Sequence, residues 1–326
     1  MSKFDEVSSM NHEITPIDFK RIGFYPGWAG DCMQEFLLDT LTHINYAFAI
    51  PCAEGKLLPI DQPELVHKLI QYAHERKIKV GIAVGGWSYQ GIPLEATFVQ
   101  ATETEERRKQ LVYSILKVVD DYGFDGVDMD WEYPKPGISA SQYEMFMILL
   151  KAELMSRGKF LSASVIAYAP LIGNGQTDMV LQLVDWINLM AYDSDDEGGH
   201  ASVTITNQSL HYWIYQRKVP SHKVVLGLPF YSRPSYKPFC EIVAYDQDAA
   251  NVDELLMDGV MENYNGIPTI ISKTKWALEN VGGIMVWEVT QDTKVQRLSL
   301  LNAISQTVNS SYNTFDTSKE TLPYNF

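Results

Sequence analysis

The sequence predicts an α/β fold of the closed (β/α)8 TIM barrel type, in which eight parallel strands alternate with helices. Short runs rich in β-branched and aromatic residues alternate with longer amphipathic stretches along most of the 326-residue chain. Eight such alternations favour a closed parallel barrel over an open sheet. The chain is 46% hydrophobic, which is enough for one large core, and a barrel of this length forms one domain.

The expected elements follow from these periodicities. Strands are predicted at residues 21–25, 43–50, 79–84, 123–130, 160–166, 186–191, 223–229 and 283–287. Helices are predicted at residues 62–76, 105–121, 141–156, 208–217 and 273–279, with a closing helix at 293–308. The barrel should therefore span residues 21–308, with an elaborated loop at 234–281 that carries a short helix near 252–257. A polar N-terminal extension (1–20) and a polar C-terminal tail (309–326) should flank it.

Composition narrows the classes of function. The net charge of −15 argues against nucleic acid or an anionic membrane as partner. Residues 1–20 contain no apolar signal-peptide core and no transmembrane segment is visible, so the expected location is the cytoplasm, or outside the cell by a non-standard export route.

Cys32, Cys52 and Cys240 show no metal-ligand spacing and are expected to be free thiols, although Cys32 and Cys52 could pair in an exported protein. We expect no cofactor and no metal, because no nucleotide-binding or zinc motif is present. The oligomeric state is not indicated.

The most informative segment is an array of four acids at the end of the fourth predicted strand. Asp128, Asp130 and Glu132 alternate at a spacing of two, which places them on one face of a strand. Crowded acids repel one another and resist desolvation, so at least one should hold a proton near neutral pH. Such a cluster at the carboxyl end of a barrel strand is typical of acid/base catalysis, with a solvated loop or a divalent-cation site as alternatives. Asp125 has the opposite parity and is predicted to be structural.

The pattern Asp-x-x-Asp-x-Asp-x-Glu resembles the signature of glycoside hydrolase family 18, the chitinases and their relatives. Further segments resemble the family's strand motifs in the right order: residues 23–28, 45–48, 85–87, 190–193, 228–233 and 282–287. The resemblance covers residues 21–308. It implies retaining, substrate-assisted hydrolysis of β-1,4 linkages between N-acetylglucosamine residues in chitin or its oligosaccharides.

The resemblance also implies residue roles. Glu132 would protonate the glycosidic oxygen, Asp130 would orient the acetamido group that attacks the anomeric carbon, and Asp128 would share a proton with Asp130. Tyr192 would hydrogen-bond the acetamido oxygen, and Trp287 would stack beneath the sugar ring. The other expected substrate-binding residues are Tyr25, Phe48, Gly86, Trp87, Met190, Asp193 and Arg233, where Arg233 would bind sugar hydroxyls or fix Asp193.

Two positions depart from the family pattern. Many relatives carry Tyr and Ser at the positions of Phe24 and Ala83, and both hydroxyls then bond the deepest paired acid. Their joint absence predicts that Asp128 is poorly supplied with hydroxyl donors. Two other functions remain open from the sequence: an endo-β-N-acetylglucosaminidase acting on N-glycans, and a non-catalytic chitin-binding lectin.

Overall fold

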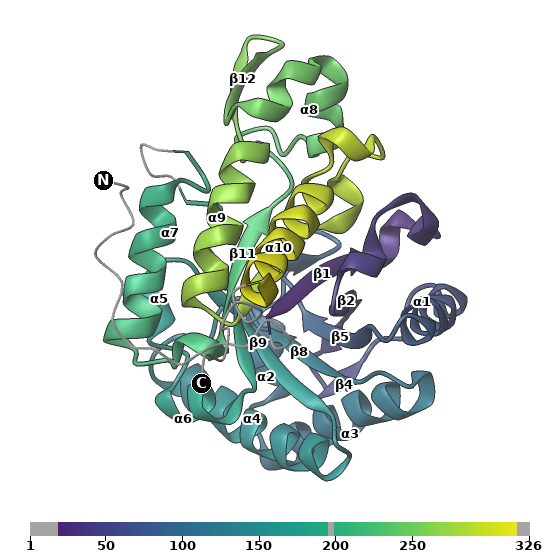
Figure 1. Cartoon of the computed structure of the whole chain (residues 1–326). Coiled ribbons are helices and arrows are strands. Elements are labelled where there is room, and N and C mark those ends of the chain that lie inside the picture. The colour runs from purple at the N-terminus through teal and green to yellow at the C-terminus, as the bar shows by residue number, and fades with distance from the viewer. Residues whose placement is uncertain (1–18, 195–198, 318–326) are drawn as a thin grey trace, which may run out of the picture.

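The computed structural model describes residues 19–194 and 199–317 and shows a closed eight-stranded parallel barrel surrounded by helices (Figure 1). The predicted extension at residues 1–20 lies almost wholly outside the described residues. Each barrel strand pairs with its sequence neighbour, and the last strand pairs with the first. The barrel strands are β1 (Lys20–Pro26), β2 (His43–Ala49), β5 (Lys79–Gly85), β8 (Gly126–Asp130), β9 (Phe160–Ile166), β10 (Trp186–Met190), β11 (Val224–Pro229) and β14 (Gly283–Trp287). The predicted TIM barrel is confirmed.

Helices cover the outside of the barrel. They are α1 (Pro63–Glu75), α2 (Glu95–Ala101), α3 (Glu105–Tyr122), α4 (Ile138–Ser156), α5 (Pro170–Gly173), α6 (Asp178–Leu183), α7 (Val203–Leu210), α8 (Phe239–Tyr245), α9 (Ile267–Asn280) and α10 (Leu300–Thr317). Local signals set several ends: Thr104 caps α3 by accepting from the Arg107 amide, and Gly123 ends it at a φ of 84°. Between β1 and β2 the chain forms only 3-10 turns, η1 (Gly27–Ala29), η2 (Met33–Glu35) and η3 (Leu38–Thr40).

The elaborated loop between β11 and β14 differs from the prediction. Residues 252–257 do not form a helix, because β12 (Glu254–Met257) pairs with β13 (Val260–Asn263) in an antiparallel hairpin. Asp258 and Gly259 connect the strands with φ angles of 52° and 82°. An Asp-Gly pair with two positive φ values suits a tight hairpin turn, a signal that outweighs the helical periodicity here. The hairpin and α8 project together from the barrel (Figure 1).

The C-terminal tail also starts later than predicted. Helix α10 continues past Asn309 to Thr317 and packs against α9. The three cysteines have free thiols. In the described part of the chain, no helix is long and apolar enough to cross a membrane. Two further short hairpins, β3 (Pro51–Cys52) with β4 (Lys56–Leu57) and β6 (Ser88–Tyr89) with β7 (Ile92–Pro93), extend the loops after β2 and β5.

Strand parity divides the core into two layers. Val127 and Met129 of β8 pack outward into the main apolar cluster between barrel and helices. A smaller cluster fills the barrel interior, where Phe160 lies against Trp186. Gly126 is required here, because a Cβ would come within 2.5 Å of the Phe160 ring. These side chains fill the barrel interior near the amino ends of the strands. The polar groups lie nearer the carboxyl ends.

Candidate active site

The acid array lies on the inner face of β8, as its spacing predicts. Asp128 and Asp130 are buried, and Glu132, just beyond the strand, is half-buried. Burial, together with the charges of Glu132 and Asp128, raises the pKa of Asp130 well above its ordinary value. One oxygen of Asp130, Oδ1, has no hydrogen-bond partner among the described residues. The pKa of Asp130 thus lies well above that of an ordinary carboxyl, and its Oδ1 is left for a further hydrogen-bond partner.

Asp128 is anchored from the two following strands. Its carboxyl oxygens accept hydrogen bonds from Ser162 Oγ at 2.5 Å, Ser164 Oγ at 2.9 Å and Asn188 Nδ2 at 2.8 Å. The expectation that Asp128 lacks hydroxyl donors is therefore wrong, because β9 supplies two hydroxyls in place of those missing at Phe24 and Ala83. Burial still raises its pKa to about 6, against the opposing effect of the three donors.

Glu132 has the properties of a proton donor. Burial raises its pKa to about 7, a hydrogen bond with Tyr133 works against this rise, and the charge of Asp193 adds to it. Its carboxyl is thus substantially protonated near neutral pH, as a general acid requires. Because Glu132 and Asp130 influence each other, their protons are released as a coupled group.

Tyr192 lies among the acids, as predicted. Its ring is buried, and its pKa is raised by burial and by the charges of Asp130, Asp193 and Glu132. Gly227 of β11 leaves room for this ring, because a Cβ there would lie 2.9 Å from Tyr192 Cε1. The neutral hydroxyl is therefore a hydrogen-bond donor placed beside the acid array.

Aromatic rings form one wall of the site. Trp287, half-buried at the end of β14, stacks on Phe48 at 5.6 Å and meets Phe24 edge-on at 5.5 Å. Trp28 lies 6.5 Å from Trp287 and is 66% exposed, and Trp87 is 61% exposed. Flat apolar faces of this kind suit stacking on the apolar faces of sugar rings.

Gly86 and Met190 are also predicted to bind substrate, and both lie near the residues just described. Gly86 adopts a φ of 93°, and a Cβ there would press on the Phe48 ring at 3.0 Å. Its amide donates to the Asp130 carbonyl at 2.8 Å, so it holds the β5 loop against β8. Met190 is half-buried and packs on the interior cluster.

The prediction that Tyr25 binds substrate is wrong. Its side chain is fully buried in the outer apolar layer, since Phe24 and not Tyr25 has the inward parity on β1. The Tyr25 hydroxyl donates to the Gly30 carbonyl at 2.6 Å and accepts from the Cys32 amide at 3.0 Å. It therefore shapes the loop after β1 and does not reach a sugar.

Asp125 points away from the acids. Its Oδ2 accepts from the Val80 amide at 2.8 Å and lies 2.8 Å from His74 Nε2, so it joins β8 to β5 and α1. Arg233 Nε lies 3.5 Å from Asp193 Oδ1, and its guanidinium lies over the Tyr236 ring at 4.2 Å. Arg233 was expected to bind sugar hydroxyls or to fix Asp193, and the structure shows the contact with Asp193.

Sequence reasoning missed several polar residues. Ser162 and Ser164 had a detectable signal, since two small polar residues at spacing two are unusual in a buried strand. Asn188 is a polar residue in the buried strand β10. Glu288 is also buried, and burial raises its pKa to about 7, although Thr290 donates to it. In the described residues, no group of three or more His, Cys, Asp or Glu side chains could hold a metal ion.

Fold and site together define a TIM barrel with a buried carboxyl cluster and an aromatic wall at the carboxyl ends of its strands. The family model "Glycosyl hydrolases family 18" matches residues 20–292, and the chain belongs to this family. The structure resembles a GH18 chitinase from Flavobacterium johnsoniae, with a TM-score of 0.79 and 29% identity over 90% of this chain and 95% of the other. It also resembles a chitinase from Bacteroides thetaiotaomicron, with a TM-score of 0.77 and 26% identity over 89% and 96%.

Curated relatives match over shorter lengths. Mouse chitotriosidase-1 is 29% identical over 59% of this chain and 47% of its own length. Chitinase B of Serratia marcescens is 25% identical over 59% of this chain and 50% of its own. The chain thus spans about half the length of these relatives.

Proposed function

We propose that this protein is a chitinase that hydrolyses β-1,4 linkages between N-acetylglucosamine residues with retention of configuration. The observation that carries this proposal is the line of Asp128, Asp130 and Glu132 along the inner face of β8 and just beyond it, with Tyr192 buried in the barrel interior and the pKa of Glu132 raised to about 7. Membership of glycoside hydrolase family 18 and the chitinase names of its relatives support it.

In the proposed reaction, Glu132 transfers its proton to the glycosidic oxygen as the bond from that oxygen to the anomeric carbon breaks. The carbonyl oxygen of the substrate's own acetamido group bonds the anomeric carbon and forms an oxazolinium ion. Asp130 orients the acetamido group and offsets the positive charge, and Tyr192 donates to the acetamido oxygen. Water then attacks the same carbon, the bond from that carbon to the acetamido oxygen breaks and restores the acetamido group, and the water gives a proton to the Glu132 carboxylate, which restores the acid.

The decisive experiment is product analysis on chitin oligosaccharides with detection of the first-formed anomer. Release of the β-anomer supports retention, and release of the α-anomer contradicts it. Glu132→Gln should lower kcat by about 10²- to 10⁴-fold and leave oligosaccharide binding intact. Glu106→Gln, at an exposed position on α3, is the matched control and should leave kcat unchanged.

Parallel assays on chitin oligosaccharides and on a high-mannose glycoprotein, with a binding measurement, separate the other two functions. Cleavage of a high-mannose glycoprotein and not of chitin oligosaccharides would identify an endo-β-N-acetylglucosaminidase. Tight oligosaccharide binding without turnover in the unmodified protein would identify a lectin. Glu132 and its two supporting acids are all present, and this favours an enzyme.

A further inference from the structure

Asp193 is close enough to the proton donor to affect it electrically. It directly follows Tyr192, has a φ of 57° and keeps 43% of its side chain exposed. Its negative charge contributes to the raised pKa of Glu132. Whatever fixes the position and charge of Asp193 therefore also affects the acid.

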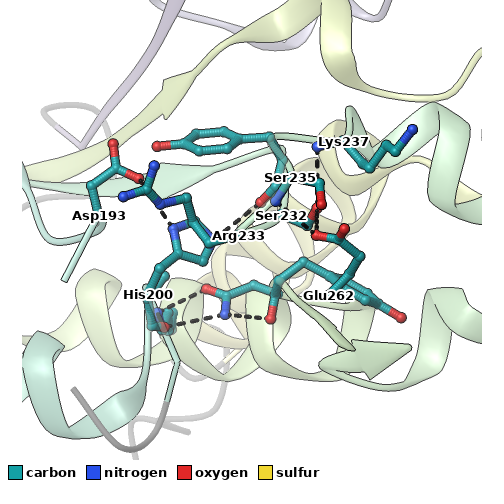
Figure 2. Close-up of polar contacts among 12 residues, drawn as sticks. Asp193, His200, Ser232, Arg233, Ser235, Lys237 and Glu262 are labelled. Atoms are coloured by element: carbon teal, nitrogen blue, oxygen red, sulfur yellow. Dashed lines mark hydrogen bonds and ion pairs between the residues drawn. The ribbon is translucent and has the colours of Figure 1, made fainter. Parts of the chain in front are cut away.

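Three side chains surround the Asp193 carboxylate. Arg233 Nε and His200 Nδ1 each lie 3.5 Å from Asp193 Oδ1, and Tyr231 hydrogen-bonds the same group. Burial alone would raise the pKa of Asp193, but His200, Tyr231 and Arg233 together bring it below its ordinary value. Figure 2 shows Asp193, Arg233 and His200 converging from separate segments.

Of these three, His200 is the most buried, with 3% of its surface exposed. Its Nε2 lies 3.2 Å from the backbone carbonyl oxygen of Tyr231. A carbonyl only accepts, so Nε2 must carry a proton. Nδ1 has no hydrogen-bond partner among the described residues, and the Asp193 carboxylate lies 3.5 Å from it. A proton on Nδ1 makes this nitrogen a donor to the carboxylate. An unprotonated Nδ1 would instead place its lone pair next to a lone pair of the carboxylate oxygen, which is repulsive.

The segment that carries His200 is held rigidly from α9. The Ala201 carbonyl accepts from the buried Lys273 ammonium at 2.7 Å and from Asn265 Nδ2 at 3.2 Å. The next residue, Ser202, caps α7 by accepting from the Ile205 amide. Besides Asp193, the charged and titratable groups next to the imidazole include Arg233 after β11, which shares the Asp193 contact, and Tyr231, whose ring lies 5.1 Å away. Glu262 on β13 accepts from Ser232 within the same cluster of polar residues (Figure 2), and the Lys273 ammonium on α9 bonds the carbonyl of the next residue, Ala201.

We propose that His200 is a positioning residue: its buried imidazole, locked by the Tyr231 carbonyl, holds Asp193 ionised and correctly oriented beside Glu132. Asp193 in turn keeps the proton on Glu132 and steadies the substrate's acetamido group. This inference rests on the proposed chitinase function for its kinetic consequence, but its structural content is independent of turnover.

Two substitutions at His200 separate its contacts. His200→Gln can keep the donor to the Tyr231 carbonyl and loses the Nδ1 contact with Asp193. Kcat on chitin oligosaccharides should then fall about tenfold or more, with a smaller change in KM. The alkaline limb of the pH–rate profile should move to lower pH, because an Asp193 carboxylate that Nδ1 no longer holds in place raises the pKa of Glu132 less. His200→Asn, whose amide nitrogen can occupy the place of Nδ1, should recover part of kcat.

The matched control is the second His–Asp pair, outside the site. His74 Nε2 lies 2.8 Å from Asp125, so His74→Asn, whose amide nitrogen replaces Nδ1 and not Nε2, removes a similar contact and should change stability without moving the pH–rate profile. A purely structural role for His200 predicts the same pattern for both histidine variants. An unshifted alkaline limb in His200→Gln, together with wild-type kcat, would overturn the proposal.

A direct measurement works without turnover. The carboxyl ¹³C signal of Asp193 can be titrated in the unmodified protein and in His200→Asn and His200→Gln. Loss of the Nδ1 contact should raise the pKa of Asp193 in His200→Gln, and an unchanged titration contradicts the proposal. An unmodified protein that cleaves no chitin oligosaccharide refutes the proposed function, while this titration still decides the role of His200.

Discussion

Replacing Asp128 by Asn should stabilise the protein above about pH 6 and leave its stability almost unchanged in acid. The three donors remain satisfied in principle: the amide oxygen can accept from Ser162 and Asn188, and the amide nitrogen can donate to Ser164. The substitution thus removes a buried ionisable group without removing its partners.

The magnitude follows from the raised pKa. Burial raises the pKa of Asp128 from 3.8 to about 6, so between these values the folded chain binds a proton that the unfolded chain has released. Wild-type stability must therefore fall as the pH rises through this window. At about 1.4 kcal/mol per pH unit, the loss is roughly 3 kcal/mol and is complete above about pH 6.

Urea unfolding of both proteins at pH values from 4 to 8 tests this. The difference in unfolding free energy should grow in favour of Asp128→Asn from near zero at pH 4 to roughly 3 kcal/mol above pH 6. Activity should fall at the same time, because the proposed proton sharing between Asp128 and Asp130 is lost. A difference that stays constant with pH would refute the reasoning.

Three further predictions concern the site. Because burial raises the pKa of Glu132 to about 7, the rate on chitin oligosaccharides should fall on the alkaline side of about pH 7 as the proton donor ionises; a flat profile to pH 9 would contradict this. Gly227→Ala would place a Cβ 2.4 Å from the Leu189 carbonyl oxygen and 2.9 Å from Tyr192 Cε1. Urea unfolding should therefore show a free energy of unfolding lower by about 1–3 kcal/mol, and kcat should also fall. Unchanged stability would contradict this geometry. Trp287→Ala should weaken oligosaccharide binding roughly tenfold or more, measured by calorimetry, whereas Trp287→Phe should retain most of it; equal losses in both variants would argue against stacking.

The strand order and the acid array were predictable because both depend on local periodicity. The period of two along β8 fixes which side chains face inward, whatever the neighbouring strands do, and Asp128, Asp130 and Val127 lie on the faces that it indicates. The same rule turns Tyr25 outward, because Phe24 has the inward parity on β1. The Asp258-Gly259 pair is likewise a local signal, and it favours the β12–β13 hairpin over a helix.

The sequence by itself determined the barrel, the side of β8 on which the acids lie and the aromatic residue that ends β14. Only the tertiary structure decided what surrounds those acids. The groups that hold Asp128 come from 34 to 60 residues away, and the hydrogen bonds from His200 to Tyr231 and from Lys273 to Ala201 join residues 31 and 72 positions apart. Such contacts depend on how the strands are staggered when the barrel closes, and no pattern within one strand carries that information.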